Sequence, residues 1–311
     1  MDMPKLLDGR LKLRHLILVD ALTRQGSVIG AAAALHVTQP VATRSLHDLE
    51  SILGVTLYER GPRGVTPTIF GEAFTSHARA VLAQLNQAGR HVVELADADR
   101  GTVVVGTHLA GSNVLLPVAI ARLKAERPLL TVIVREGSPE VLMVELEAGR
   151  VDLIVGRLTS PTDEFAVRST LYEESVELVT RADHPLAGRT ALTLDDVRAF
   201  PWILPGTETA LRRELEEFYV RHGIRLPENR VEATSFLTVR RLLVETDMIA
   251  VLPSLIARDD DRLTTVPVPL DPIGHSVGIT LSASRTLSPS AEALVGNLRQ
   301  IAAEMIPGRG N

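Results

Sequence analysis

Cysteine is absent from this chain of 311 residues, and aromatic residues make up only 3% of it. The absence of cysteine excludes a disulfide framework and thiolate metal ligands, and it fits a reducing compartment. Because aromatics are scarce, Leu, Val, Ile and Ala must fill the cores. No run approaches the roughly 18 apolar residues of a membrane helix, and the first residues lack the apolar core of a signal peptide. We therefore expect a cytoplasmic protein with no membrane segment.

The net charge of −5 hides an uneven distribution. Residues 1–90 contain 10 Lys and Arg against 7 Asp and Glu, whereas residues 91–311 contain 23 against 31. The chain is also longer than one hydrophobic core usually supports. A mildly basic N-terminal part on an acidic body is typical of a nucleic-acid-binding domain joined to a domain with another task. The contrast is small and assigns no function alone.

The N-terminal part is predicted to form three helices and a pair of strands. Apolar residues in 13–22 predict a first helix that ends at Arg24-Gln25-Gly26. Ser27 is placed to cap an Ala-rich second helix over 28–35, and His36-Val37 forms a tight connection. Thr38 is placed to cap a third helix, which has Pro40 in its first turn and ends at Gly54. Two strands, over 55–58 and 64–66, are expected on either side of a turn over 60–63.

Two helices joined by so short a turn have the geometry that places the second helix in the major groove of DNA. Gln39 can pair with an adenine edge, Arg44 with guanine or phosphate, and Thr43 with a phosphate or a thymine methyl. Arginines at the tip of the strand pair suit phosphate or minor-groove contact. A plain helical bundle with solvated polar faces is the alternative. The predicted DNA-contacting residues are Thr38, Gln39, Pro40, Thr43, Arg44, Arg60 and Arg63.

A long helix is predicted after the strand pair, capped near Thr66 or Thr68. Its apolar residues recur at spacings of three and four, close to a heptad seam. Because the helix is long and joins two unlike regions, we favour a linker that pairs two copies over a helix lying on a core. The seam consists of Phe70, Phe74, Ala78, Val81, Leu85, Ala88, Val92 and Leu95.

From Thr102 onward short apolar strands alternate with amphipathic helices, which predicts parallel β-α-β units. Prolines break up the second half, which indicates a subdivided body. The expected strands are 103–105, 130–134, 151–155, 176–179 and 248–252, and the expected helices include 115–126, 139–148 and 211–222.

The run from Ala31 to Glu50, followed by Leu53 to Arg60, closely resembles the LysR-type transcriptional regulators. In that family an Ala-rich helix leads into a Ser/Thr-Gln-Pro start of the recognition helix, here Thr38-Gln39-Pro40. A Leu-Phe-x-Arg strand follows, here with Tyr58 in place of Phe, and Thr68-Ile69-Phe70-Gly71 matches the start of the linker helix. The resemblance continues through 145–156 and through Asp183-His184-Pro185-Leu186.

This resemblance implies an α/β fold class with an N-terminal all-α winged helix-turn-helix, a long linker helix and a two-lobed, periplasmic-binding-protein-like effector domain. It also implies a regulator that is no enzyme, needs no cofactor or metal, and forms a homodimer or homotetramer. Its partners would be double-stranded promoter DNA, a small-molecule effector and, indirectly, RNA polymerase. The expected domains are 1–67, 68–98 and 99–311, with lobe one at 101–174 and 277–311, lobe two at 175–276, and crossovers near 173–176 and 276–278.

A ligand of an open α/β sheet sits at the carboxyl ends of the strands, on the loops and helix N-termini that follow. Arg157 and His108 lie at such positions and favour an anionic ligand, so we expect a small organic acid or a sugar-derived metabolite. Segments 7–16 and 27–29 resemble the branch that regulates sugar uptake or protocatechuate-type catabolism. Ser138 and Ser235 are expected to cap helices whatever binds, and Arg157 could instead be a solvated surface charge. The predicted effector contacts are Thr107, His108, Ser138, Arg157, Thr207 and Ser235.

The sequence Gly274-His275-Ser276-Val277-Gly278 matches the nucleophile elbow of α/β-hydrolases. That elbow needs a strand before the serine and a helix directly after it. Here Pro267, Pro269 and Pro272 disrupt the approach, and 279–282 is another expected strand, so a hydrolase is disfavoured. A plain solute-binding protein is a third possibility, disfavoured by the N-terminal 90 residues and the lack of a signal peptide.

Overall fold

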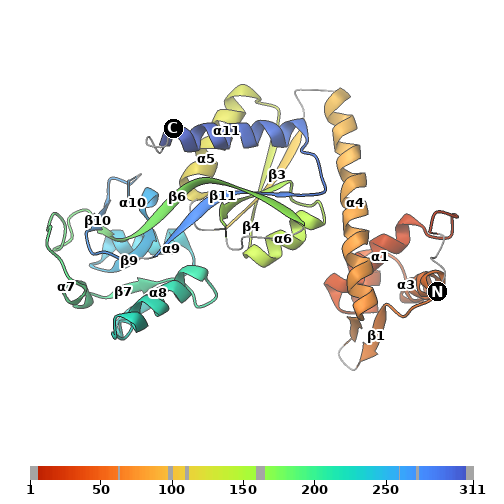
Figure 1. Cartoon of the computed structure of the whole chain (residues 1–311), viewed down its shortest axis with the longest axis horizontal. Helices are drawn as coiled ribbons and strands as arrows, with labels where there is room; N and C mark the ends of the chain where they lie inside the picture. The colour runs from red at the N-terminus through yellow and green to blue at the C-terminus, as the bar shows by residue number, and fades with distance from the viewer. Residues whose placement is uncertain are drawn as a thin grey trace.

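The computed structural model describes residues 6–61, 64–96, 101–108, 112–158, 165–258, 260–270 and 273–305. Arg63, one of the predicted DNA contacts, lies outside these ranges. The chain forms a helical head (residues 6–67), one long helix and an α/β body (residues 101–305) (Figure 1). None of the helices in the described residues could cross a membrane.

The head contains α1 (Leu13–Gln25), α2 (Val28–Ala34) and α3 (Gln39–Leu53), as predicted, followed by β1 (Tyr58–Gly61) and β2 (Gly64–Pro67). Gly26 and Gly54 end α1 and α3 in the left-handed conformation, with φ of +62° and +72°. The first strand begins three residues later than expected. Leu57 stands before the ladder, and its backbone N–H donates to the Glu50 carboxylate at 2.8 Å.

The long helix α4 (Ile69–Ala96) begins where predicted, and the Thr68 hydroxyl accepts the N–H of Gly71 at 3.1 Å. One face of α4 lies on the head, where Ala78 is buried, and another lies on the body, where Ala83 is buried. A third face is exposed. The predicted seam is therefore divided: Phe74 and Ala78 pack on the head, whereas Val81, Leu85, Ala88 and Val92 are exposed.

The body is built on strands in the order β4-β3-β5-β11-β6-β9-β7-β8, with β10 beside β6. The pairs β3–β4, β3–β5, β7–β8 and β7–β9 are parallel, as predicted. The pairs that include β6 or β11 are antiparallel, so the expectation of parallel units holds only in part. The strands are β3 (Thr102–Thr107), β4 (Thr131–Glu136), β5 (Leu153–Arg157), β6 (Ala166–Arg181), β7 (Trp202–Leu204), β8 (Arg230–Glu232), β9 (Ile249–Pro253), β10 (Leu263–Val266) and β11 (Gly274–Ser282).

The antiparallel pairs follow from the path of the chain. It leaves the first lobe through β6 and returns through β11, so these two strands run in opposite directions. Strand β6 is far longer than the expected 176–179, because it pairs with β11 up to Ser175 and with β9 from Val176. One strand thus belongs to both lobes.

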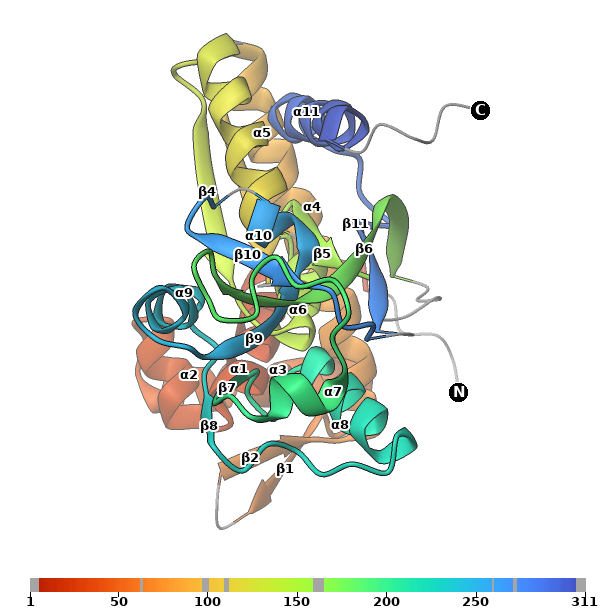
Figure 2. The same ribbon diagram turned by 90° about the vertical axis from the view of Figure 1, so that its left-hand side faces the viewer.

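Lobe one contains β3, β4, β5 and β11 with α5 (Ser112–Glu126), α6 (Pro139–Glu147) and α11 (Pro289–Met305). Lobe two contains β7 to β10 with α7 (Leu194–Arg198), α8 (Ala210–Arg221), α9 (Phe236–Glu245) and α10 (Ser254–Arg258). Helices α5 and α11 lie together over lobe one, away from α7 and α8 (Figure 2). The expected bounds of α5, α6 and α8 are close to those observed, whereas α7, α9, α10 and α11 were not among the named expected helices.

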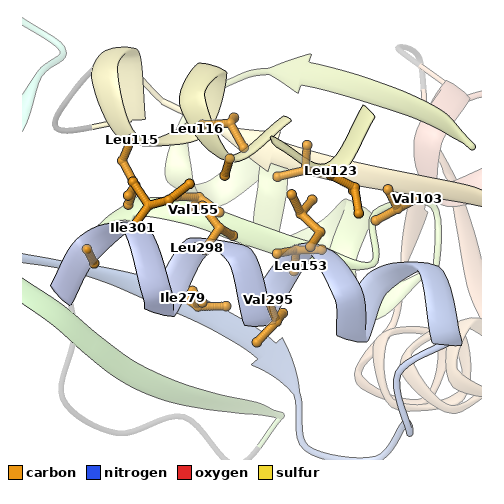
Figure 3. Packing of buried hydrophobic residues seen from close by; sticks show 14 of the residues in the cluster. Val103, Leu115, Leu116, Leu123, Leu153, Val155, Ile279, Val295, Leu298 and Ile301 are labelled. Carbon is orange, nitrogen blue, oxygen red and sulfur yellow. The ribbon is translucent and has the colours of Figure 1, made fainter. Parts of the chain in front are cut away.

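The cores of the two lobes differ in composition. In lobe one, aliphatic residues of α5 and α11 such as Leu123 and Leu298 pack on Leu153 and Ile279 of the sheet (Figure 3). Lobe two instead buries Trp202, Phe218 and Tyr219. The expectation that aliphatic residues fill the cores therefore describes lobe one better than lobe two.

Candidate DNA-binding and effector sites

The first turn of α3 presents a polar face to solvent. Gln39, Pro40 and Arg44 are exposed and Thr43 is half-buried, whereas Ala42 and Leu46 on the opposite face are buried. Thr38 occupies the N-cap position, as predicted, but its side chain makes no capping hydrogen bond. The five predicted residues of this turn therefore lie at one exposed end of the recognition helix.

The turn between α2 and α3 is tightly fixed. His36 adopts a φ of +54°, a left-handed conformation that is uncommon for residues other than glycine. Its backbone N–H bonds to the carbonyl of Ala33 at 3.2 Å, and that of Val37 bonds to the carbonyl of Ala32 at 3.0 Å. These bonds set the direction of α3 relative to α2, and the tight connection predicted at His36-Val37 is confirmed.

The strand pair, or wing, is anchored to the turn that ends α1. The N–H of Val65 donates to the carbonyl of Gly26 at 2.8 Å. A Cβ on Gly64 would lie 2.1 Å from that carbonyl oxygen, so only glycine permits this approach. Arg60 pairs with Val65 in the ladder and is exposed. The wing therefore holds Arg60 in solvent at a fixed position relative to α1.

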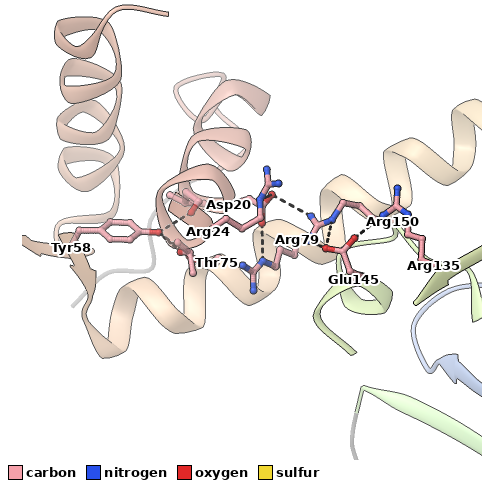
Figure 4. A network of polar contacts seen from close by, with 10 residues as sticks. Asp20, Arg24, Tyr58, Thr75, Arg79, Arg135, Glu145 and Arg150 are labelled. Atoms are coloured by element: carbon pink, nitrogen blue, oxygen red, sulfur yellow. Dashed lines mark hydrogen bonds and ion pairs between the residues drawn. The ribbon is translucent and has the colours of Figure 1, made fainter. Parts of the chain in front are cut away.

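Tyr58, which stands where the related family has Phe, joins three parts of the chain. Its hydroxyl donates to the carbonyl of Val19 at 2.9 Å and lies 2.7 Å from the Thr23 hydroxyl and 3.2 Å from that of Thr75 (Figure 4). Burial raises the pKa of this phenol. The substitution thus gives a hydrogen-bonded centre between α1, β1 and α4.

Three predicted effector contacts lie at the ends of lobe-one elements. The Thr107 hydroxyl donates to the carbonyl of Val155 at 3.0 Å and so joins β3 to β5. The His108 ring packs on Gly156, where an added Cβ would lie 2.7 Å from the ring Cε1. Ser138 caps α6 by accepting the N–H of Val141 at 3.4 Å, as expected for its structural role.

Arg157, at the end of β5, forms an ion pair with Glu214 of α8 in lobe two. The Arg157 side chain is only 12% exposed, so it is not a solvated surface charge. Burial lowers the pKa of its guanidinium, and the positive charge of Arg213 lowers it further. Sequence reasoning missed Glu214, because nothing in its helical context distinguishes it from a solvated carboxylate.

Two further predicted contacts lie in adjacent loops of lobe two. Thr207 is exposed, and α8 is capped by Thr209, whose hydroxyl accepts the N–H of Arg212 at 3.2 Å. Ser235 occupies the N-cap position of α9, as predicted, but its side chain makes no capping hydrogen bond. A Cβ on Gly206 would lie 2.7 Å from the Thr234 side chain, which places the two loops side by side.

The nucleophile-elbow motif lies inside a strand. Ser276 is in the middle of β11, and its hydroxyl donates to the Glu173 carboxylate at 2.8 Å. No helix follows it directly, so the geometry that a nucleophile elbow requires is missing. Within the described ranges, no group of three or more acidic or His side chains is arranged to hold a metal ion.

A winged helix-turn-helix joined by a long helix to a two-lobed α/β body defines a DNA-binding protein with a separate ligand-binding module. The model of the bacterial regulatory helix-turn-helix protein, lysR family, matches residues 13–72, and that of the LysR substrate binding domain matches residues 96–303. The chain therefore belongs to the LysR family. It is a DNA-binding transcription regulator whose promoter binding is modulated by a small molecule, and it is not an enzyme.

Similar proteins and solved structures agree with this family assignment. The chain is 33% identical over 308 residues to the HTH-type transcriptional regulator PcaQ of Agrobacterium fabrum, covering 98% of this chain and 99% of the relative. It is 33% identical to GbpR of Azospirillum brasilense, covering 94% and 87% of the two chains. Full-length OxyR from Pseudomonas aeruginosa has the same fold, with a TM-score of 0.64 at 24% identity over 93% of this chain and 98% of that one.

Proposed function

We propose that Thr38, Gln39, Pro40, Thr43 and Arg44 of α3 read promoter DNA, with Arg60 and Arg63 of the wing on the backbone or in the minor groove. This proposal rests on the amphipathic first half of α3, in which Ala42 and Leu46 are buried and the polar positions face solvent. Arg44 is best suited to contact a guanine, and Gln39 is best suited to contact an adenine.

Replacing Arg44 by Ala tests this assignment. Loss of a base contact should weaken binding to a selected operator by about 1–3 kcal/mol, or roughly 5–150-fold, and much less on scrambled DNA. Arg122→Ala is the matched control, because Arg122 is a partly exposed arginine of lobe one, paired with Glu304, and remote from the head. Equal losses on both DNAs would instead assign Arg44 to a phosphate.

The domains that we propose are the winged helix-turn-helix at 1–67, the linker at 68–98 and the effector domain at 99–311. Two copies would pair through the exposed apolar face of α4, where Val81, Leu85 and Val92 are 47%, 50% and 67% exposed at heptad spacing. Leu85→Glu should shift the mass in analytical ultracentrifugation towards monomer, whereas Asn86→Glu, at the neighbouring exposed position, should not. Lobe contacts would assemble dimers into tetramers.

The effector that we propose is an anion, a small organic acid or a sugar-derived acid, bound between the lobes by Thr107, His108, Ser138, Arg157, Thr207 and Ser235. The largely buried cation Arg157, balanced from the opposite lobe by Glu214, supports this choice, because a ligand carboxylate could take the place of Glu214. A thermal-shift screen of organic acids and sugars on the full chain would identify the class. Ser138→Ala and Thr107→Val should abolish the shift and leave DNA affinity unchanged.

Effector binding would change the closure of the lobes, alter the spacing of paired heads and relax a DNA bend, which changes access for RNA polymerase. The setting for this activity would be the cytoplasm. DNA-bend measurements with and without a hit from the screen test the mechanism, and an unchanged bend would contradict it.

A further inference from the structure

A cluster of charged side chains joins the head directly to lobe one. The Asp20 carboxylate of α1, with a side chain 9% exposed, pairs with Arg79 of α4 at 2.9 Å, Arg24 of α1 at 3.2 Å and Arg150 of lobe one at 3.5 Å (Figure 4). Arg150 also pairs with Glu145 of α6 at 2.7 Å. We call these five residues the head–lobe cluster. It connects the DNA-binding head, the linker helix and lobe one of the same chain.

Further along α4, polar contacts bind the linker helix to lobe one. Arg90 pairs with Asp152 at 2.8 Å, and Gln87 donates to the carbonyl of Thr286. The second oxygen of Asp152 accepts the N–H of Val104 in β3 at 2.8 Å. A single carboxylate therefore fixes α4 to two strands, β3 through its hydrogen bond and β5 through its position directly before that strand.

The helix and lobe one also approach closely between these two groups. A Cβ on Gly149 would lie 2.5 Å from the Cβ of Ala83, which is fully buried on α4. Gly149 has a φ of +67°, which favours glycine. Contact this close means that displacement of one element displaces the other.

The elements that carry these contacts reach the proposed effector site at their other ends. Strand β3 leads from Val104 to Thr107, which His108 follows, and β5 starts directly after Asp152 and ends at Arg157. Helix α6 runs from its cap Ser138 to Glu145. Three regular elements therefore connect the cleft side of lobe one with its head side.

On the head side, Asp20 belongs to α1, whose buried residues share one core with α3. Val19 and Leu22 of α1 pack with Leu46 and Leu49 of the recognition helix. Movement of Asp20 would thus be passed to α3 through a packed core rather than through a flexible tether.

We propose that the head–lobe cluster and the Arg90–Asp152 pair couple the effector cleft to the recognition helix within one chain. Asp20, Arg150 and Asp152 are positioning residues that touch neither DNA nor effector. Lobe movement would pass along β3, β5 and α6 to α1 and then to α3. This proposal rests on the proposed DNA-binding face and effector cleft, and it adds the route between them.

Thermodynamic reciprocity allows a test without the effector, because DNA binding must then alter the cleft by the same coupling. The probe is a DNA duplex selected by the full chain from a random pool. Hydrogen exchange of amides in 102–108, 138–147 and 153–157 is compared with and without this DNA. Wild type should show a DNA-dependent difference in all three segments, and Arg150→Ala should reduce it to less than about half.

Two further variants separate coupling from misfolding. Arg150→Lys keeps the charge and should retain most of the difference, whereas Asp152→Asn keeps the shape but loses the charge facing Arg90 and should reduce it. Arg122→Ala, which breaks the Arg122–Glu304 pair elsewhere in lobe one, should behave as wild type. Saturation with DNA is verified in each case.

Equal exchange differences in wild type and Arg150→Ala, or no difference in DNA-saturated wild type, would overturn the coupling route while leaving DNA recognition intact. Failure of the selection to yield a bound duplex would instead contradict the proposed DNA-binding face.

Discussion

Two sets of charged side chains join separately packed parts of this chain, and they differ in how many partners each charge has. In the head–lobe cluster Asp20 faces three arginines, and Arg150 faces two carboxylates. Between the lobes Arg157 faces Glu214. The second oxygen of Glu214 is buried without a hydrogen-bond partner among the described residues.

This difference indicates which joint can open. If Asp20 leaves, the largely buried Arg79 loses its counterion and Arg150 keeps only Glu145, so its departure is costly. A single pair with an unsatisfied oxygen is less well compensated, so an incoming anion can replace Glu214 at a smaller cost. We expect the head–lobe joint to transmit movement and the interlobe joint to open and close.

The largest expected effect is that of Asp20→Ala. Three arginines, of which Arg79 and Arg150 are largely buried, lose their common counterion, which should lower the free energy of unfolding by about 2–3 kcal/mol. Urea denaturation followed by circular dichroism measures the change. Asp8→Ala, which removes an exposed pair with Arg10, should leave the urea midpoint close to that of wild type. Similar losses of stability in both variants would mean that burial of Asp20 does not strengthen its ion pairs.

Gly149→Ala tests the packed contact beside the cluster. The new Cβ would require a left-handed backbone and would collide with Ala83, so a loss of about 1–3 kcal/mol is expected. Gly89→Ala, on α4 where nothing lies within 4 Å of an added Cβ, should instead gain about 0.5–1 kcal/mol. A tolerated Gly149→Ala would show that helix and lobe can separate slightly without cost.

Much of the head could be predicted from sequence because its signals are local. Gly26, Ser27 and Gly54 mark helix ends through their own backbone or side chains, and the structure confirms all three. At β1, which begins later than expected, Leu57 before the strand donates to Glu50, seven positions earlier in the chain. A side chain acting at that distance leaves no periodic signal.

The body was less predictable because its decisive contacts join distant segments. The length of β6 depends on partners in β11 and β9, and Arg157 meets a carboxylate 57 positions away. The link from Asp20 to Arg150 spans 130 positions. One signal was available: Asp152 is a carboxylate inside the apolar run 151–155, where a buried charge needs a partner.

Glu214→Gln should have a smaller effect on stability than either change at the head–lobe joint. The amide oxygen can still accept from Arg157, so the free energy of unfolding should fall by about 1 kcal/mol or less. Removing the competing carboxylate should at the same time strengthen binding of an anionic hit from the thermal-shift screen. Glu217→Gln, at an exposed position on the same helix, is the control. Weaker anion binding in Glu214→Gln would contradict the idea that ligand and Glu214 compete.

The smallest expected effect is a change in how stability depends on pH. Hydrogen bonds from Arg150 hold the pKa of Glu145 below its ordinary value of 4.5, so its stabilisation is present above pH 4.5 and is lost as the pH falls through the lowered pKa. Burial raises the pKa of Asp152 above its ordinary value of 3.8, so the folded state binds this proton more readily and gains stability as the pH falls.

The two carboxylates therefore oppose each other in acid. Asp152→Asn removes only the stability that wild type gains when Asp152 is protonated. The stability of this variant should therefore fall more steeply than that of wild type as the pH drops below the raised pKa of Asp152. Glu145→Gln should change the slope in the opposite sense. Urea midpoints measured at a series of pH values give both slopes. Parallel curves for wild type and Asp152→Asn would mean that Arg90 compensates the burial of Asp152 completely, and the linker contact would then be as well satisfied as the cluster around Asp20.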